Sequence, residues 1–137
     1  MDRVCHFEVP YDDKDRMEKF YSGVFGWNFI PAPGEMPYTF AMTTEVNEQM
    51  MPEKVGGING GTYPRPTDDM PVARHPVIVV EVENCEQKLS EIEASGGSTV
   101  VGAQNVGGMG IYAQVKDTED NIIGLWQPLP REDCAEG

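Results

Sequence analysis

Residues 4–27 read VCHFEVPYDDKDRMEKFYSGVFGW, and the fold is inferred from the pattern that they contain. The first eight alternate between apolar and polar side chains, which predicts a strand over residues 4–11. Asp12 and Asp13 follow as candidate helix N-caps. Apolar residues then recur at the spacing of one helix face, at Met17, Phe20, Tyr21, Val24 and Phe25. Gly26 is placed to end this helix in the left-handed conformation.

The same pattern returns at an offset of 71 residues, which places Phe7 on Ile78, Asp13 on Asn84 and Gly26 on Gly97. This register predicts a second strand over residues 77–82, with its core face on Ile78, Val80 and Val82, and a second helix after Asn84. Further short strands are expected after both helices, over residues 27–30, 38–43 and 56–63 in the first half and 98–101, 110–116 and 122–127 in the second. The sequence therefore predicts an α+β fold of two βαβββ modules.

We predict one domain over residues 1–137. Module one covers residues 3–63 and module two covers residues 76–128. A proline-rich linker, 64–75, joins them, and a polar tail, 129–137, follows.

Each module is expected to cover the outer face of its sheet with its own helix, leaving the inner face for the other module. The two modules would then form a cup-shaped, partly closed mixed sheet with both helices outside. His6 and Glu8 would face this cup from the first strand, and Val77 and Val79 from its counterpart. The glycines at 56, 57, 60 and 61 indicate that something approaches the backbone closely and that volume inside the cup is left unfilled.

Composition excludes several classes of protein. Hydrophobic residues make up 39% and charged residues 24%, with no apolar run long enough for a spanning helix and no apolar leader, so a membrane protein is not expected. Ten basic against 23 acidic residues give a net charge of −13, which disfavours nucleic acid as a partner. Three cysteines without metal-type spacing fit a reducing cytoplasm.

The chain resembles the vicinal oxygen chelate superfamily, which includes glyoxalase I, bleomycin-resistance proteins and extradiol dioxygenases. The resemblance is carried in order by residues 6–10 (HFEVP), 20–27 (FYSGVFGW), 55–61 (VGGINGG), 80–84 (VEVEN) and 116–127 (KDTEDNIIGLWQ). The glycine-rich segment and the ending GLWQ are most similar to the glyoxalase-like subgroup. The resemblance implies a small organic ligand and a homodimer.

Metal-dependent relatives hold a divalent ion with four side chains, and these positions fall here on His6, Asn59, Val77 and Gly124. One imidazole and one amide are too few to bind a divalent ion tightly. We therefore predict that the inherited metal site is lost and that no other cofactor is needed.

The resemblance also implies lyase or isomerase chemistry near a carbonyl, with His6 and Glu8 as candidate catalytic residues that handle the proton. Both have an alternative role: His6 could line a pocket or bind a metal, and Glu8 could be a structural hydrogen-bond acceptor. Asn59 could position a substrate oxygen or stabilise a bulge in the glycine-rich strand. The candidate substrate-binding residues are Asn59, Val77, Val79, Tyr112, Gln114, Gly124 and Trp126. Tyr112, Gln114 and Trp126 could equally fill the core, because strand parity beyond the loops is not fixed by the sequence.

Three functions stay open at this point. The first is a small-molecule-binding protein without the family metal, which could also be a metal-independent lyase or isomerase. The second is a metal-dependent lyase or dioxygenase with ligands from unexpected positions. The third is a non-catalytic structural or regulatory dimer whose cup is filled by side chains.

Overall fold

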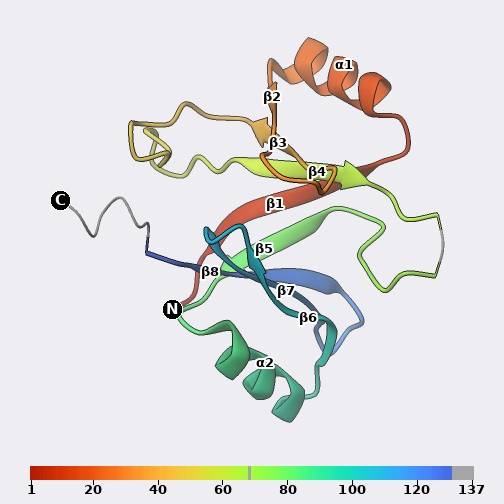
Figure 1. The fold of residues 1–137 in the computed structure, drawn as a ribbon, viewed down its shortest axis with the longest axis vertical. Coiled ribbons are helices and arrows are strands. Elements are labelled where there is room, and N and C mark those ends of the chain that lie inside the picture. The colour runs from red at the N-terminus through yellow and green to blue at the C-terminus, as the bar shows by residue number, and fades with distance from the viewer. Residues whose placement is uncertain (68, 131–137) are drawn as a thin grey trace. The chain divides into compact units, whose positions relative to one another are not determined.

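The computed structural model describes residues 1–67 and 69–130 (Figure 1). The elements, in chain order, are β1 (Val4–Tyr11), α1 (Lys14–Phe25), β2 (Asn28–Pro31), β3 (Thr39–Met42), β4 (Gly60–Pro64), β5 (Val77–Glu81), α2 (Cys85–Ala94), β6 (Ser98–Val106), β7 (Gly110–Lys116) and β8 (Ile122–Pro128). They form two compact units. The N-terminal unit comprises Cys5–Asp69 and Arg74–Pro76, and the C-terminal unit comprises Met1–Val4, Met70–Ala73 and the chain from Val77 onward.

The two units share one topology. In the N-terminal unit β1 pairs in parallel with β4, which pairs antiparallel with β3, and β3 pairs antiparallel with β2. In the C-terminal unit β5 pairs in parallel with β8, followed by antiparallel β7 and β6. Both units are thus βαβββ modules with the same strand order, and the predicted α+β class is confirmed. The predicted cup concerns how the units face each other and stays a prediction.

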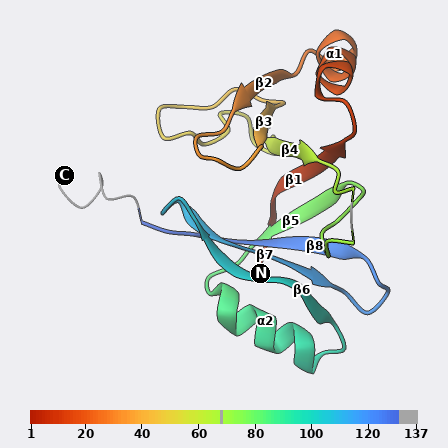
Figure 2. The same cartoon turned by 45° about the vertical axis from the view of Figure 1, so that its right-hand side comes forward.

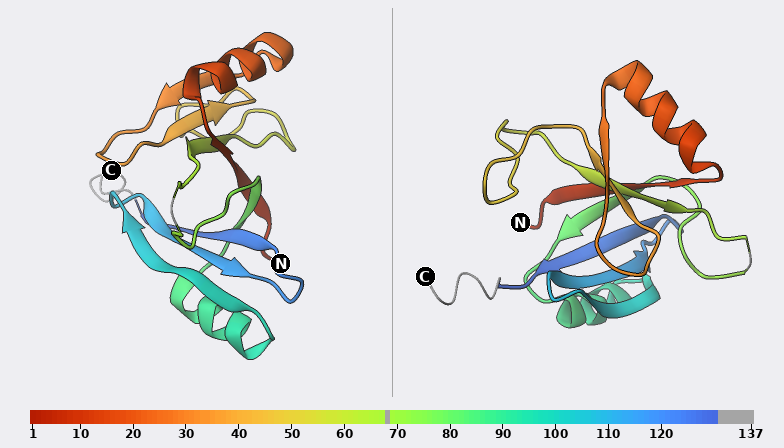
Figure 3. Two further views of the ribbon diagram at one scale, coloured as in Figure 1. Left: turned by 90° about the vertical axis from the view of Figure 1, so that its right-hand side faces the viewer. Right: turned by 45° about the horizontal axis from the view of Figure 1, so that its top comes forward.

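Local side-chain chemistry fixes both helices as predicted. Asp13 Oδ1 accepts a hydrogen bond from the Arg16 N–H (3.0 Å) at the start of α1, and Asn84 Oδ1 accepts from the Gln87 N–H (2.9 Å) at the start of α2. Gly26 ends α1 with φ 75°, in the left-handed region that favours glycine. The chain leads from the end of α1 directly into β2 (Figure 3, right).

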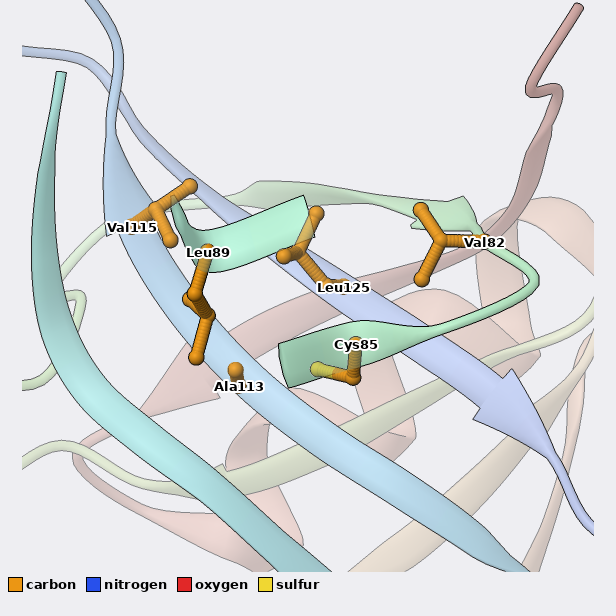
Figure 4. Close-up of a cluster of buried hydrophobic side chains, with 6 residues drawn as sticks. All are labelled: Val82, Cys85, Leu89, Ala113, Val115 and Leu125. Atoms are coloured by element: carbon orange, nitrogen blue, oxygen red, sulfur yellow. The ribbon is translucent and has the colours of Figure 1, made fainter. Parts of the chain in front are cut away.

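The core of the C-terminal unit lies between α2 and its sheet. Cys85 and Leu89 on α2 pack with Val82 and with three strand residues, Ala113, Val115 and Leu125 (Figure 4). Figure 2 shows α2 lying along one face of β6–β8. The prediction that the second helix covers one face of its own sheet is therefore confirmed, with Ile92 partly buried beside this core.

The first helix behaves differently, and here the prediction of a covering helix is wrong. None of the α1 residues is buried, and Phe20, Val24 and Phe25 are 55%, 61% and 59% exposed. The aromatic side chains at the end of α1 pack on one another and on Trp27, which stacks on Tyr21 with ring centroids 4.7 Å apart. Trp27 in turn contacts Phe7 of β1, so these two rings occupy the space next to the strand.

One residue that was predicted on the core face of β5 is not buried. Val80 packs against the α2 core and Val82 is buried within it, as expected, but Ile78 is 50% exposed. The core is centred on Val82 and the first turns of α2, and Ile78 lies at the opposite end of the strand.

Two predicted strands have different bounds. The glycine-rich strand begins at Gly60 instead of Gly56, because Gly56 turns the chain with φ 89° and the Gly57 N–H donates to the Lys54 carbonyl (3.1 Å). The strand after α2 continues to Val106 through irregular pairing between Thr99 and Gln104. Of the predicted tail, Leu129 donates its N–H to the Met109 carbonyl (3.0 Å). Residues 131–137 of the tail, Cys134 among them, and residue 68 of the linker lie outside the described residues.

Candidate functional site

His6 and Glu8 lie on the face of β1 that points away from α1. Phe7, between them, points to the helix side, where its ring contacts Trp27 (centroids 5.6 Å apart). Because side chains alternate along a strand, His6 and Glu8 share the helix-free face of the N-terminal unit. His6 is partly buried and Glu8 is only 4% exposed. The sequence prediction that these two side chains lie together on one face is confirmed, whereas their catalytic role stays a prediction.

Tyr38, a residue that the sequence reasoning did not assign to the site, is the side-chain partner of His6. Its Oη lies 2.9 Å from His6 Nε2. The Tyr38 side chain rests on the backbone of Gly61, where a Cβ atom would lie 1.8 Å from Oη. On the other face of the same strand, a Cβ at Gly60 would lie 2.5 Å from the Phe7 ring. The predicted close approach to this glycine segment is therefore confirmed.

The expectation that the glycines leave empty volume is wrong at these positions. Aromatic rings occupy the space beside Gly60 and Gly61, and the Thr44 side chain occupies the space beside Gly57 (2.8 Å from a Cβ). Only Gly56 of the four has open space beside it. The missing side chains at 60 and 61 thus accommodate two rings from the same unit, one on each face of β4.

Burial determines the charge of His6. Withdrawal of the imidazole from water lowers its pKa from 6.5 to about 4, and a hydrogen bond with the Asn59 backbone raises the pKa by a smaller amount. Because that bond favours the protonated ring, we assign the ring as donor and the Asn59 carbonyl as acceptor. Nε2 then accepts the Tyr38 hydroxyl proton, and the imidazole is neutral near pH 7.

The Asn59 side chain stabilises the end of β3. Its Oδ1 accepts hydrogen bonds from the N–H groups of Thr43 (2.7 Å) and Thr44 (2.9 Å). These bonds correspond to the structural alternative considered for this residue, since the amide oxygen is engaged by the backbone. A role of Asn59 in positioning a substrate oxygen stays a prediction.

The other predicted binding residues all lie on the helix-free face of the C-terminal unit. Val79 pairs with Gly124, which pairs with Gln114, and Trp126 pairs with Tyr112 in the next row of that face. Val77 precedes Val79 by two residues on the same strand. Ala113 and Leu125, which alternate with them, face α2. This resolves the parity that the sequence left open.

This face is well packed. Gln114 Nε2 donates to Tyr112 Oη (2.8 Å), and Gln114 Oε1 accepts from the Ala73 N–H (3.1 Å). A Cβ at Gly124 would lie 3.0 Å from Val79 Cγ2. Val77, Val79, Gln114 and Gly124 are buried, whereas Tyr112 and Trp126 are partly exposed. The ligand-binding roles of these six residues stay predictions.

The donor set that the resemblance implies does not fit a divalent ion. Val77 and Gly124 have no side-chain donor atom, and the Asn59 oxygen already accepts two backbone hydrogen bonds. Among residues 1–67 and 69–130, no three His, Cys, Asp or Glu side chains converge as metal ligands would. The metal-free interpretation stays a prediction about the protein in solution.

Two surface hollows lie away from the predicted site residues. One, of about 370 Å³, is formed in the N-terminal unit by the end of β1, the first turns of α1 and Arg65. The other, of about 340 Å³, is formed in the C-terminal unit by Met1–Arg3, Glu81–Glu83 and Pro128. Within the described part of the chain, no helix is both long and apolar enough to cross a membrane.

Several solved structures share this fold. A hypothetical protein from Bacillus halodurans C-125 has a TM-score of 0.66 at 9% identity, covering 95% of this chain and 96% of its own. Methylmalonyl-CoA epimerase from Mycobacterium tuberculosis has a TM-score of 0.62 at 15% identity, covering 98% and 91%. A glyoxalase/bleomycin resistance protein/dioxygenase superfamily member from Vibrio splendidus 12B01 has a TM-score of 0.55 at 12% identity, covering 94% and 100%. The chain has the fold of this superfamily.

A family model also matches part of the first module. Residues 3–44 match the family described as bleomycin resistance protein-like N-terminal. A comparison with curated proteins found no match. The resemblance to the vicinal oxygen chelate superfamily is therefore confirmed by the fold of both modules and by the sequence of the first.

Proposed function

We propose that this protein binds a small organic molecule on the helix-free face of the N-terminal unit, without a metal ion. The observation that carries this proposal is the hydrogen bond between His6 Nε2 and Tyr38 Oη, 2.9 Å long, on a face that also holds the buried Glu8. A few polar groups among apolar side chains are typical of small-molecule sites. Tyr38 and Phe40, whose rings meet edge to face at 5.8 Å, supply the apolar part.

The protonation state of this pair restricts the ligand. With Nε2 accepting from Tyr38, the hydroxyl oxygen can accept a hydrogen bond from a ligand through a lone pair. A neutral imidazole adds no positive charge to attract an anion, and the chain carries a net charge of −13. A ligand with hydroxyl or amine donors on an apolar body therefore suits the face better than a carboxylate or a phosphate.

The experiment is a binding screen with the protein purified in the presence of a chelator. Thermal shift against a metabolite library identifies ligands, and calorimetry measures their affinity with and without divalent ions. Tyr38→Phe removes one hydrogen bond to the ligand, which costs about 1 kcal/mol and should weaken binding roughly fivefold to tenfold. The loss of affinity should be larger in His6→Gln. His75→Gln is the matched control because His75, the second histidine, is exposed in the linker.

Two results would refute this proposal. Affinity that is the same in His6→Gln, Tyr38→Phe and the control would place the ligand elsewhere. Binding that is lost on chelation and restored by a divalent ion would show that a metal is required. Equal binding in both conditions, with weakening in the two site variants only, would support it.

A second candidate function is a metal-independent isomerase or lyase, and the position of Glu8 favours it. This carboxylate is 4% exposed and lies two residues from a neutral imidazole on the same strand face. Such a carboxylate could remove a proton next to a carbonyl and, once protonated, return it to the substrate. The Mycobacterium tuberculosis neighbour, a methylmalonyl-CoA epimerase, shares the fold.

Proton exchange separates the two candidates. Incubation of ligands from the screen in D₂O, followed by NMR, reports deuterium at the carbon next to a carbonyl. Exchange that requires the protein and disappears in Glu8→Gln, but not in His75→Gln, would support the enzyme. Saturable binding without exchange would leave the binding function alone.

A further inference from the structure

The hollow beside α1 is a part of the N-terminal unit that neither candidate function uses. Its volume of about 370 Å³ lies in the range of roughly 300–1,000 Å³ that small-molecule sites occupy. Val9 and Tyr11, which line it, lie on the same side of β1 as Phe7, whereas His6 and Glu8 lie on the opposite face. A molecule in this hollow would therefore contact different side chains from one on the helix-free face.

One wall of the hollow is apolar and comes from α1. Met17, Phe20 and Tyr21 line it. Phe20 is 55% exposed, and its ring meets Tyr21 edge to face with centroids 5.1 Å apart. The apolar stripe that its own sheet does not bury thus borders a hollow of small-molecule size, and it offers enough surface for a single ring or a short hydrocarbon chain.

Arg65 fixes the opposite side of the hollow. Its Nη1 donates to Asp12 Oδ2 (2.6 Å) and its Nε donates to the Arg74 carbonyl (2.9 Å). Its backbone N–H donates to the Tyr11 carbonyl (2.7 Å) at the end of β1. These bonds hold the chain around the hollow and balance the charge of Asp12.

Arg16 is a cation at this hollow whose side chain has no partner in the described part of the chain. The two carboxylates that precede it are engaged, Asp12 by Arg65 and Asp13 by the Arg16 backbone N–H (3.0 Å). One turn further along the helix, on the same face, the sequence has Phe20 instead of an acidic residue. The guanidinium donors of Arg16 are therefore available next to the apolar wall.

These charges select a monocarboxylate. A guanidinium donates two parallel hydrogen bonds to a planar carboxylate, which is one of the strong pairings in proteins. A phosphate monoester carries up to two negative charges, and it would place the second one near Asp12 and Asp13 in a chain of net charge −13. A neutral ligand would not use the charge of Arg16.

We propose that this hollow is a second ligand site, which takes a monocarboxylate with an aromatic or similarly sized apolar body. The carboxylate lies on the Arg16 guanidinium, and the body lies against Met17, Phe20 and Tyr21. This site is independent of the ligand proposed for the helix-free face.

NMR titration of the ¹⁵N-labelled native chain with 3-phenylpropionate tests the proposal. The amide signals of residues 9–21 and of Arg65 should shift saturably, with a dissociation constant of about 1–5 mM, as expected for so small a ligand at an open site. The neutral 3-phenylpropionamide should bind roughly fivefold more weakly or worse, because it lacks the charge that Arg16 pairs with. The same loss is expected for 2-phenylethyl phosphate.

Substitution of Arg16 tests the contact directly. Arg16→Gln should weaken binding of 3-phenylpropionate roughly fivefold to tenfold, because it removes the charge and the paired donors. Arg16→Lys, which keeps the charge without the planar fork, should weaken it less. Lys19→Gln is the matched control, since Lys19 is exposed on the same helix, does not line the hollow and contributes the same charge. Circular dichroism checks that these variants of exposed residues are folded.

His6→Gln separates this site from the proposed function, because it should leave the affinity for 3-phenylpropionate unchanged. The absence of saturable shifts would overturn the proposal, as would equal affinities in Arg16→Gln and Lys19→Gln or for the acid and its amide. Shifts centred on His6 and Tyr38 that disappear in Tyr38→Phe would also overturn it, because they place the probe on the helix-free face. Saturable shifts around the hollow, weakened by substitution of Arg16 but not of Lys19, would establish it.

Discussion

Acid should destabilise this protein through His6. The pKa of His6 is lowered from 6.5 to about 4 by burial, so the folded chain resists a proton that the unfolded chain binds readily. Below pH 6.5 the unfolded state therefore holds more protons, and the free energy of unfolding falls as the pH falls. The loss is complete near pH 4. A shift of this size corresponds to about 3 kcal/mol.

The assay compares the native chain with His6→Gln, which cannot take up a proton at this position. Urea denaturation followed by circular dichroism, at pH steps from 8 to 4, gives the free energy of unfolding for both. Titration of the acidic residues is common to the two chains, so the difference between their pH profiles isolates His6. The native chain should lose about 3 kcal/mol more than the variant between pH 7 and pH 4.

NMR provides a direct check because the chain contains only two histidines. His75→Gln assigns the two imidazole signals, and the His6 signal should titrate near pH 4. A His6 signal that titrates near 6.5, or equal pH profiles for the native chain and His6→Gln, would show that the imidazole is hydrated. The neutral His6 on which the ligand proposal depends would then be wrong.

Three other substitutions test the packing. Gly61→Ala should lower the free energy of unfolding by about 1–3 kcal/mol because the new Cβ would collide with Tyr38. Gly102→Ala, which has open space beside it, should lower it little, and equal urea midpoints for the two variants would contradict this. Leu89→Ala should cost about 2–4 kcal/mol in the same assay because Leu89 fills the α2 core, and a loss below 1 kcal/mol would refute that packing. Asn84→Ala should cost about 1 kcal/mol through loss of the Gln87 cap, with Asn84→Asp retaining most of the stability.

Local signals account for what the sequence predicted well. The caps Asp13 and Asn84, the left-handed Gly26 and the alternation along β1 each depend on residues that are neighbours in the chain. These features can be predicted without knowing which distant residues come into contact. The repeated topology followed from these signals because both modules use them in the same order.

The candidate site was predicted only in part because its contacts are long-range. Alternation placed His6 and Glu8 on one face, but the partner of His6 is 32 residues away, immediately before β3. Tyr38 reaches His6 because Gly61 leaves room for its ring, and a glycine does not reveal which side chain fills the space beside it. Both glycines 60 and 61 were interpreted as empty volume for this reason, and both are covered by rings.

The two helices show how one pattern leads to two outcomes. Both have an N-cap and apolar residues at helical spacing, and sequence alone assigns both to the cover of a sheet. Cys85 and Leu89 are compact aliphatic or thiol side chains that fit against Ala113, Val115 and Leu125. The α1 stripe is aromatic, and the strand residues facing that side include Gly60, which Phe7 covers. The aromatic rings at the end of the helix stack on one another and on Trp27, which removes part of their surface from water. Phe20, Val24 and Phe25 nevertheless remain exposed. A stripe that its own sheet does not bury contributes less to the stability of its unit than the buried core around α2 does.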